Sequence, residues 1–167
     1  MRMHHTLALI ASLIMPVAWA SDAQAAPWHT VRHADDGFVV EFSDNVSGTP
    51  TTGSNYRATQ YVQDGGSYAY IVAATVYEVG VSIDFDENVK RAMSVLNCSS
   101  IDSEVSPSSS ADRNREIHGS KCNQGVRAGV AFFLAGRRFY QVMYLIPNDS
   151  DSSDAEHFLH SFKLIAE

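Results

Sequence analysis

Three segments of this chain are apolar on both of the faces that a β-strand presents. They span residues 68–77, 126–134 and 139–146. Successive side chains of a strand point to opposite sides of a sheet. In the first segment Val72 and Ala74 therefore lie on one side, and Ile71 and Ala73 lie on the other. This pattern is typical of a sheet that is covered on both sides.

Two amphipathic helices are available to provide that cover. Asp84 is suited to cap the first helix, with Glu87 three residues later completing a capping-box-like pair. Its apolar residues recur at helical spacing: Phe85, Val89, Ala92, Met93 and Leu96. Ser153 and Glu156 match the capping box of a second helix. The apolar stripe of that helix is Ala155, Phe158, Leu159 and Phe162.

Strand-like patterns continue in other parts of the chain, at residues 28–33, 38–42, 56–62 and 113–122. Asp36-Gly37 between the first two predicts a tight hairpin turn. Residues 43–55 are rich in Ser, Thr, Gly, Asp and Asn and contain Pro50, so a long loop is expected there. The fold class predicted is α+β, a twisted and mainly antiparallel sheet with helices packed on both faces, which is an α-β-α sandwich.

The N-terminal segment has the layout of a secretory signal peptide. A weakly basic start is followed by an apolar run over residues 7–20, which is too short to span a bilayer. Small residues favour cleavage after Ala20 or Ala25. We therefore expect a signal peptide at 1–25 and a single exported domain at 26–167, periplasmic or secreted. No later segment is long and apolar enough for stable membrane insertion, so the mature protein is expected to be soluble.

The chain contains two cysteines, Cys98 and Cys122. In an oxidising compartment a disulfide between them is the default prediction, and closing that loop stabilises the fold by about 3 kcal/mol. The alternative is a pair of redox-active thiols, for which the Cys-x-x-Cys spacing is missing.

Histidines are the main candidates for metal ligands. His157 and His160 lie one helical turn apart, close enough to share an ion, but they also lie off the apolar stripe, which favours a solvent-facing pair. His29 and His33 fall in an extended segment, where they would stand about 13 Å apart and could not bind one ion. Those two are expected at the core edge or on the surface.

Other chemical motifs are weak or missing. There is no Gly-x-Ser-x-Gly elbow and no phosphate-binding glycine loop. Asp84 and Asp86 are better explained by helix capping than as a catalytic pair. Residues 149–153 begin like a calcium loop, but Asp154 and His160 stand where Gly and Glu are required. The net charge of −7, without a basic run, argues against nucleic-acid binding. No catalytic residue, cofactor site or cofactor is predicted.

Two C-terminal segments and one N-terminal segment resemble the PsbP/Mog-like family of α-β-α sandwiches. They are the hairpin at 131–142, the helix at 155–164 and the strand Gly37-Phe38-Val39-Val40-Glu41-Phe42. The resemblance implies a binding or assembly module whose partner is an unknown protein or small ligand. The function expected is therefore an exported, soluble, non-catalytic binding or assembly module. The alternative is a periplasmic hydrolase or metal-dependent enzyme with a dispersed site.

Overall fold

The computed structural model describes residues 27–165, and the predicted signal peptide at 1–25 lies outside them. Of the described residues, 51% lie in strands and 17% in helices. The strands are β1 (His29–His33), β2 (Phe38–Phe42), β3 (Gly48–Thr52), β4 (Tyr56–Asp64), β5 (Ala69–Tyr77), β6 (Ser100–Val105), β7 (Arg113–Cys122), β8 (Val126–Ala135), β9 (Arg138–Pro147) and β10 (Lys163–Leu164). The helices are α1 (Phe85–Leu96), α2 (Ser153–Ser161) and the short 3-10 helix η1 (Asn123–Gly125).

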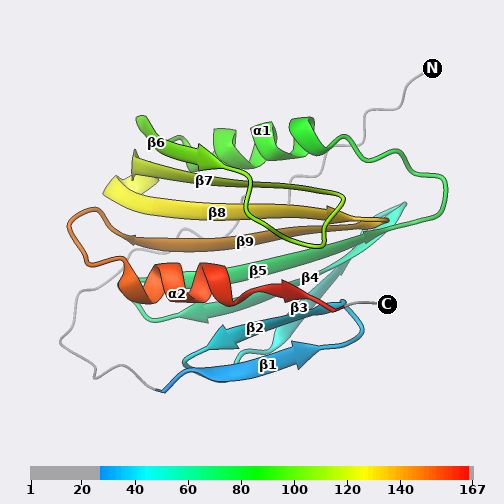
Figure 1. Cartoon of the computed structure of the whole chain (residues 1–167), viewed down its shortest axis with the longest axis horizontal. Coiled ribbons are helices and arrows are strands. Elements are labelled where there is room, and N and C mark those ends of the chain that lie inside the picture. The colour runs from blue at the N-terminus through cyan, green and yellow to red at the C-terminus, as the bar shows by residue number, and fades with distance from the viewer. Residues whose placement is uncertain (1–26, 166–167) are drawn as a thin grey trace.

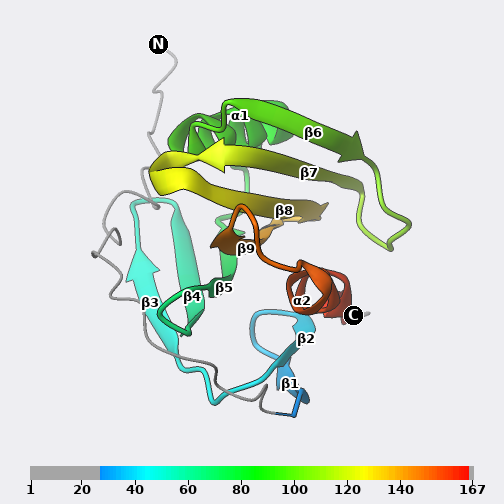
Figure 2. The same ribbon diagram turned by 90° about the vertical axis from the view of Figure 1, so that its left-hand side faces the viewer.

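The strands form two antiparallel sheets. A seven-stranded sheet has the order β3-β4-β5-β9-β8-β7-β6, and a three-stranded sheet has the order β1-β2-β10 (Figure 1). Each segment that is apolar on both faces becomes a central strand of the large sheet, as β5, β9 and β8. Figure 2 shows the large sheet curving around α2, β1 and β2.

The predicted α-β-α sandwich is wrong, because the described chain is mostly β and its strands form two antiparallel sheets instead of one. The hairpin of β1 and β2 does not join the large sheet. Phe38, Val40 and Phe42 of β2 are all completely buried, so one side of this small sheet is apolar enough to cover the large sheet together with α2. Alternation shows that a strand has a buried side, but it does not show which sheet the strand joins.

Two apolar clusters lie on opposite faces of the large sheet, and alternate residues of β9 contribute to each. Tyr140 and Val142 belong to the cluster beneath α2 and the small sheet. Phe139 and Met143 belong to the cluster beneath α1. Val72 and Val142 have no solvent exposure. Because side chains of a strand alternate between the two faces, the apolar residues of β9 contribute to two separate cores.

The two helices begin differently. Asp84 caps α1 as expected, because its Oδ1 accepts a hydrogen bond of 3.0 Å from the backbone N–H of Glu87. The capping box predicted for α2 is not formed. Its N-cap residue is Ser152, whose side chain makes no capping hydrogen bond. Instead Oδ1 of Asp151 accepts a hydrogen bond from the backbone N–H of Ser153, which removes Ser153 from the cap position.

The long loop predicted at 43–55 contains a strand. β3 pairs with β4 at one edge of the large sheet, and every residue of β3 is exposed. Pro50 is compatible with this position, because proline is tolerated on an edge strand. The polar, exposed composition that suggested a loop is therefore that of an edge strand with no buried side.

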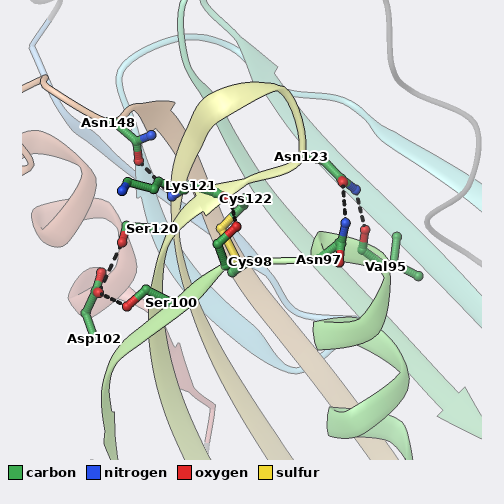
Figure 3. Close-up of a disulfide and its surroundings, with 11 residues drawn as sticks. Val95, Asn97, Cys98, Ser100, Asp102, Ser120, Lys121, Cys122, Asn123 and Asn148 are labelled. Atoms are coloured by element: carbon green, nitrogen blue, oxygen red, sulfur yellow. Dashed lines mark hydrogen bonds between the residues drawn. A yellow bond between two sulfur atoms is a disulfide. The ribbon is translucent and has the colours of Figure 1, made fainter.

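The predicted disulfide between Cys98 and Cys122 is present, with an S–S distance of 2.02 Å (Figure 3). It links the segment after α1 to the end of β7. Asn97 ends α1 in a left-handed conformation, with φ of 47°. Asn123 accepts a hydrogen bond from the Asn97 side chain and donates one to the carbonyl of Val95. The C-terminus of α1 is thus joined to the large sheet by covalent and hydrogen bonds.

Within the described part of the chain, neither helix has the length and hydropathy needed to cross a membrane.

Candidate functional site

A polar cluster lies between α2 and the large sheet, where side chains of α2 reach β9 and β7. Glu116 and His118 come from β7, Tyr144 comes from β9, and Glu156 and His160 come from α2. Glu116 and His118 are two residues apart on a strand, so they lie on the same face of the sheet. Glu156 and His160 are four residues apart on a helix, so they also lie side by side. The packing of α2 brings the two pairs together.

Gly129 makes room for this cluster. It lies on β8, directly between His118 and Tyr144 in the sheet register. A Cβ at this position would collide with the aromatic ring of Tyr144. Because glycine has no side chain, the Tyr144 ring extends across β8, and its hydroxyl reaches His118 on the far strand at 3.1 Å.

Hydrogen bonds connect all five side chains. Oε1 of Glu116 lies 2.8 Å from Nε2 of His118 and 3.2 Å from Nε2 of His160. Tyr144 donates its hydroxyl proton to Oε1 of Glu156 at 2.7 Å. That proton is the only one on the hydroxyl, so the contact between Tyr144 and Nδ1 of His118 requires a proton on the ring nitrogen. The pattern is fully satisfied when His118 is an imidazolium.

The cluster contains a buried charged group, which the hydrogen bonds around it stabilise. Glu116 is only 6% exposed. The hydrogen bond from His118 lowers the pKa of Glu116, although burial acts in the opposite direction. The same hydrogen bond raises the pKa of His118. Burial, followed by the hydrogen bond to Glu156, raises the pKa of Tyr144, which keeps the phenol protonated. A buried carboxylate of this kind needs a cationic neighbour.

Three of these residues could together hold a metal ion. One ligand atom each from Glu116, Glu156 and His160 can be chosen so that all lie within 4.8 Å of one another. Nε2 of His160 lies 3.2 Å from a Glu116 oxygen and 4.0 Å from a Glu156 oxygen. Ligand atoms of a tetrahedral site with bonds of about 2.1 Å are about 3.4 Å apart. Small side-chain movements would therefore close the triad around one ion.

The structure separates the two histidines that the sequence pairs. Nε2 of His157 lies 2.6 Å from Oε2 of Glu41, and its ring centroid lies 4.7 Å from that of Trp28. His160 instead contacts Glu116. The two side chains remain partly exposed, 47% for His157 and 57% for His160. They are neighbours on the helix surface, but each contacts a different carboxylate.

The other candidate residues, His29, His33, Asp84 and Asp86, lie apart from this cluster and make packing, capping or ion-pair contacts. His29 and His33 are partly buried on β1, and Nε2 of each is buried without a hydrogen-bond partner in the described structure. The His33 ring packs against Tyr61, with 3.9 Å between ring centroids. Asp86 forms ion pairs with Arg113 and Arg115 rather than acting with Asp84.

A concave region lies at the opposite end of β9 from the α2 loop, where several loops and strand ends meet. It is an open groove of about 940 Å³ lined by residues of the β3–β4 turn, the end of β5, the β6–β7 loop, the β8–β9 hairpin and the C-terminal segment after β10. Arg57, Arg137 and Arg138 line it, together with Glu78 and Asp112. The groove is separate from the histidine–carboxylate cluster, because the two share no residue.

No protein-family model matches this chain, and a search of curated proteins finds no significant match. The chemistry of both regions is therefore inferred from their own residues.

Sequence reasoning found only one member of the triad, His160. Glu116 lies 40 or more residues away from both other members, and β7 carries several charged residues that look alike in sequence. Gly129, a glycine inside an otherwise apolar strand, was the available signal, since such a glycine often marks a close approach of other groups.

Proposed function

We propose that this chain is an exported, non-catalytic binding protein that holds a divalent transition-metal ion through Glu116, Glu156 and His160. The observation that carries the proposal is the convergence of two carboxylates and an imidazole from β7 and α2, with ligand atoms within 4.8 Å of one another. Oxygen and imidazole donors together suit Zn²⁺, Mn²⁺, Fe²⁺ or Ni²⁺ better than Ca²⁺, which prefers oxygen ligands alone.

The gradient of exposure across the triad supports binding from solvent. Glu116 is buried, Glu156 is half-buried, and the His160 side chain is 57% exposed. An ion would therefore approach past His160 and be held from below by Glu116. His118 and Tyr144 hydrogen-bond to the two glutamates, so they are placed to orient the ligands from outside the coordination sphere.

Export is supported by the signal-peptide pattern of the sequence. A disulfide between Cys98 and Cys122 is compatible with a periplasmic or extracellular location.

Direct metal titration tests the proposal. The exported protein is freed of metal by dialysis against chelator and then buffer, and titrated calorimetrically with Zn²⁺, Mn²⁺, Ni²⁺ and Ca²⁺ near neutral pH. We expect one transition-metal ion per chain and no comparable binding of Ca²⁺. Removing a ligand in His160→Ala or Glu156→Gln should weaken binding at least about tenfold, since even indirect partners of a metal contribute that much.

His157→Ala is the matched control. It removes a histidine of similar exposure from the same helix, and that side chain contacts Glu41 and Trp28. We expect its affinity for metal to equal that of the wild type, with unchanged circular dichroism for all three variants. The proposal fails if no transition metal binds saturably, or if His157→Ala and His160→Ala weaken binding equally. In that case His160 serves only as a hydrogen-bond partner of Glu116.

A further inference from the structure

The arginine-lined groove has the features of a second, independent binding site. Its volume of about 940 Å³ lies within the range of about 300–1,000 Å³ that is usual for small-molecule sites. Loops and strand ends from several elements form its walls, and such positions commonly carry binding residues on a rigid scaffold. None of its lining residues belongs to the metal triad.

Positive side chains gather in this groove although the whole chain has a net charge of −7. Arg57, Arg137 and Arg138 line it, against the acidic side chains of Glu78 and Asp112. Three of the lining side chains are positive and two are negative, and Asp36, outside the lining, pairs with Arg57. Guanidinium groups present planar sets of N–H donors that match the oxygens of carboxylates and phosphates.

The walls that carry these arginines are held in place. Arg137 donates a hydrogen bond of 2.6 Å from Nη1 to the carbonyl of Tyr77. Asp112 accepts a hydrogen bond of 2.7 Å from the backbone N–H of Gly136, which fixes the β8–β9 hairpin against the β6–β7 loop. Because these contacts already order the loop and the side chain, less conformational entropy is lost when a ligand binds.

Arg57 is anchored to a buried carboxylate at the edge of the groove. Its Nη1 lies 3.3 Å from Oδ1 of Asp36, which is 4% exposed. Tyr61 donates a hydrogen bond of 2.7 Å to the other oxygen of Asp36. Nη2 of Arg57 donates a hydrogen bond to the carbonyl of Asp35, and the side chain as a whole remains 53% exposed.

Gly37 allows Arg138 to occupy its place. Gly37 has φ of +78° in the β1–β2 turn, and a Cβ there would collide with Nη1 of Arg138 and approach the Tyr140 hydroxyl. The glycine therefore serves both the turn and the passage of the arginine side chain over it.

We propose that this groove binds a small organic oxyanion, a molecule that carries carboxylate or phosphate groups. The arginines contact its charged oxygens, and the half-buried ring of Tyr56 provides an apolar surface for its carbon skeleton. This site is distinct from the proposed metal site and does not depend on it.

Two-dimensional amide NMR of the ¹⁵N-labelled exported protein, titrated with citrate, inorganic phosphate and a phosphate monoester, tests this proposal. We expect saturable shifts at Gly136, Arg137 and neighbouring amides with at least one of these probes. Citrate alone identifies a carboxylate ligand, and phosphate or its ester identifies a phosphoryl ligand. Either result supports the site, and the absence of saturable shifts from all three at millimolar concentration overturns it.

Variants separate this site from general electrostatics and from the metal site. Arg137→Gln and Arg138→Gln should each weaken binding at least about tenfold, the loss expected for one good charge-assisted hydrogen bond. Arg91→Gln, on α1 and paired with Glu87, makes the same change of charge elsewhere and should bind like the wild type. Glu116→Gln should also bind the anion normally. The proposal is wrong if Arg91→Gln reduces binding as much as Arg137→Gln does.

Discussion

The two faces of the seven-stranded sheet are covered by different structures and carry different chemistry. The face beneath α1 is packed with apolar side chains and is joined to the helix segment by the disulfide. The face beneath α2 and the small sheet has an apolar core too, but three of the four buried polar residues, Asp36, Gln63 and Glu116, lie on its side. The fourth, Thr75, lies on the α1 side of β5. Asp36, Gln63 and Glu116 each have hydrogen-bond partners, which burial requires.

This difference indicates a division of roles. Apolar packing beneath α1 stabilises the fold without any chemically distinctive group. The α2 face gives up part of its apolar surface to hydrogen-bonded polar groups, and both proposed sites draw on elements that border it. The following predictions test that division, from the largest expected effect to the smallest.

The apolar cores of the two faces should contribute equally to stability. Phe158 on α2 and Phe132 on β8 are both fully buried. Phe158 belongs to the core on the α2 face, and Phe132 belongs to the core on the α1 face. Phe158→Ala and Phe132→Ala should each lower the free energy of unfolding by about 3–5 kcal/mol, through lost burial and the cavity left behind. Urea denaturation followed by circular dichroism measures both. A loss below about 1 kcal/mol for either variant would contradict the packing described for that face.

The disulfide should stabilise the protein without affecting the polar face. The bond closes a loop with a sequence separation of 24 residues. In the chain-entropy model its removal in Cys98→Ala/Cys122→Ala costs about 3 kcal/mol. Urea midpoints of the variant and the wild type measure the change. Metal titration of the folded variant should match the wild type, and a lost metal site would show that the two faces are coupled.

Removal of the α1 cap should cost more than the same change at α2. Asp84→Ala loses the hydrogen bond to the N–H of Glu87, and we expect a loss of about 1 kcal/mol. Ser152 makes no side-chain capping bond, so Ser152→Ala is the matched control and should change stability little. Equal losses in thermal or urea unfolding would mean that Asp84 does not act through its capping bond.

The smallest effect concerns acid stability and His33. Burial lowers the pKa of His33 from its ordinary value of 6.5, although the nearby Asp36 acts in the opposite direction. The unfolded chain therefore binds this proton more readily than the folded chain does. The stability that His33 contributes above about pH 6.5 is lost as the pH falls through its lower folded-state pKa.

His33→Phe removes this acid sensitivity. Relative to the wild type, its free energy of unfolding should rise as the pH falls from about 7.5 to about 5, measured by urea denaturation at each pH. Arg32→Gln, on the exposed side of the same strand, provides the control and should show the pH dependence of the wild type. A difference between His33→Phe and wild type that stays constant across this range would refute the prediction.

Helix caps and turns were predictable from the sequence where they depend only on residues a few positions apart. Asp84 and Glu87 are three residues apart, so their capping geometry depends only on the first turn of α1. The Asp36-Gly37 turn is equally local, and it connects β1 and β2 as expected, with Gly37 at positive φ. The capping box at Ser153 failed because Asp151 bonds the Ser153 N–H, a competition between adjacent polar residues that the motif does not resolve.

The cluster of Glu116, Glu156 and His160 could not be predicted, because Glu116 is distant in sequence from the other two. His160 is the only member that the sequence marked as a candidate ligand, paired with His157, and Glu156 was marked only as a capping residue. The actual partner, Glu116, is selected by the position of α2 over β7, which follows from how Phe158 and Leu159 pack into the core.

The sequence by itself determined the doubly apolar strands, the two helices, the hairpin turn and the cysteine pair, because periodicity, capping and turn chemistry act over a few residues. Only the tertiary structure decided that β1 and β2 form a separate sheet, and that Glu116 meets Glu156 and His160. The physical reason is that apolar burial is non-directional. Apolar burial requires the apolar sides of β2 and α2 to be covered. The shapes of the packed surfaces determine which strands and side chains β2 and α2 contact.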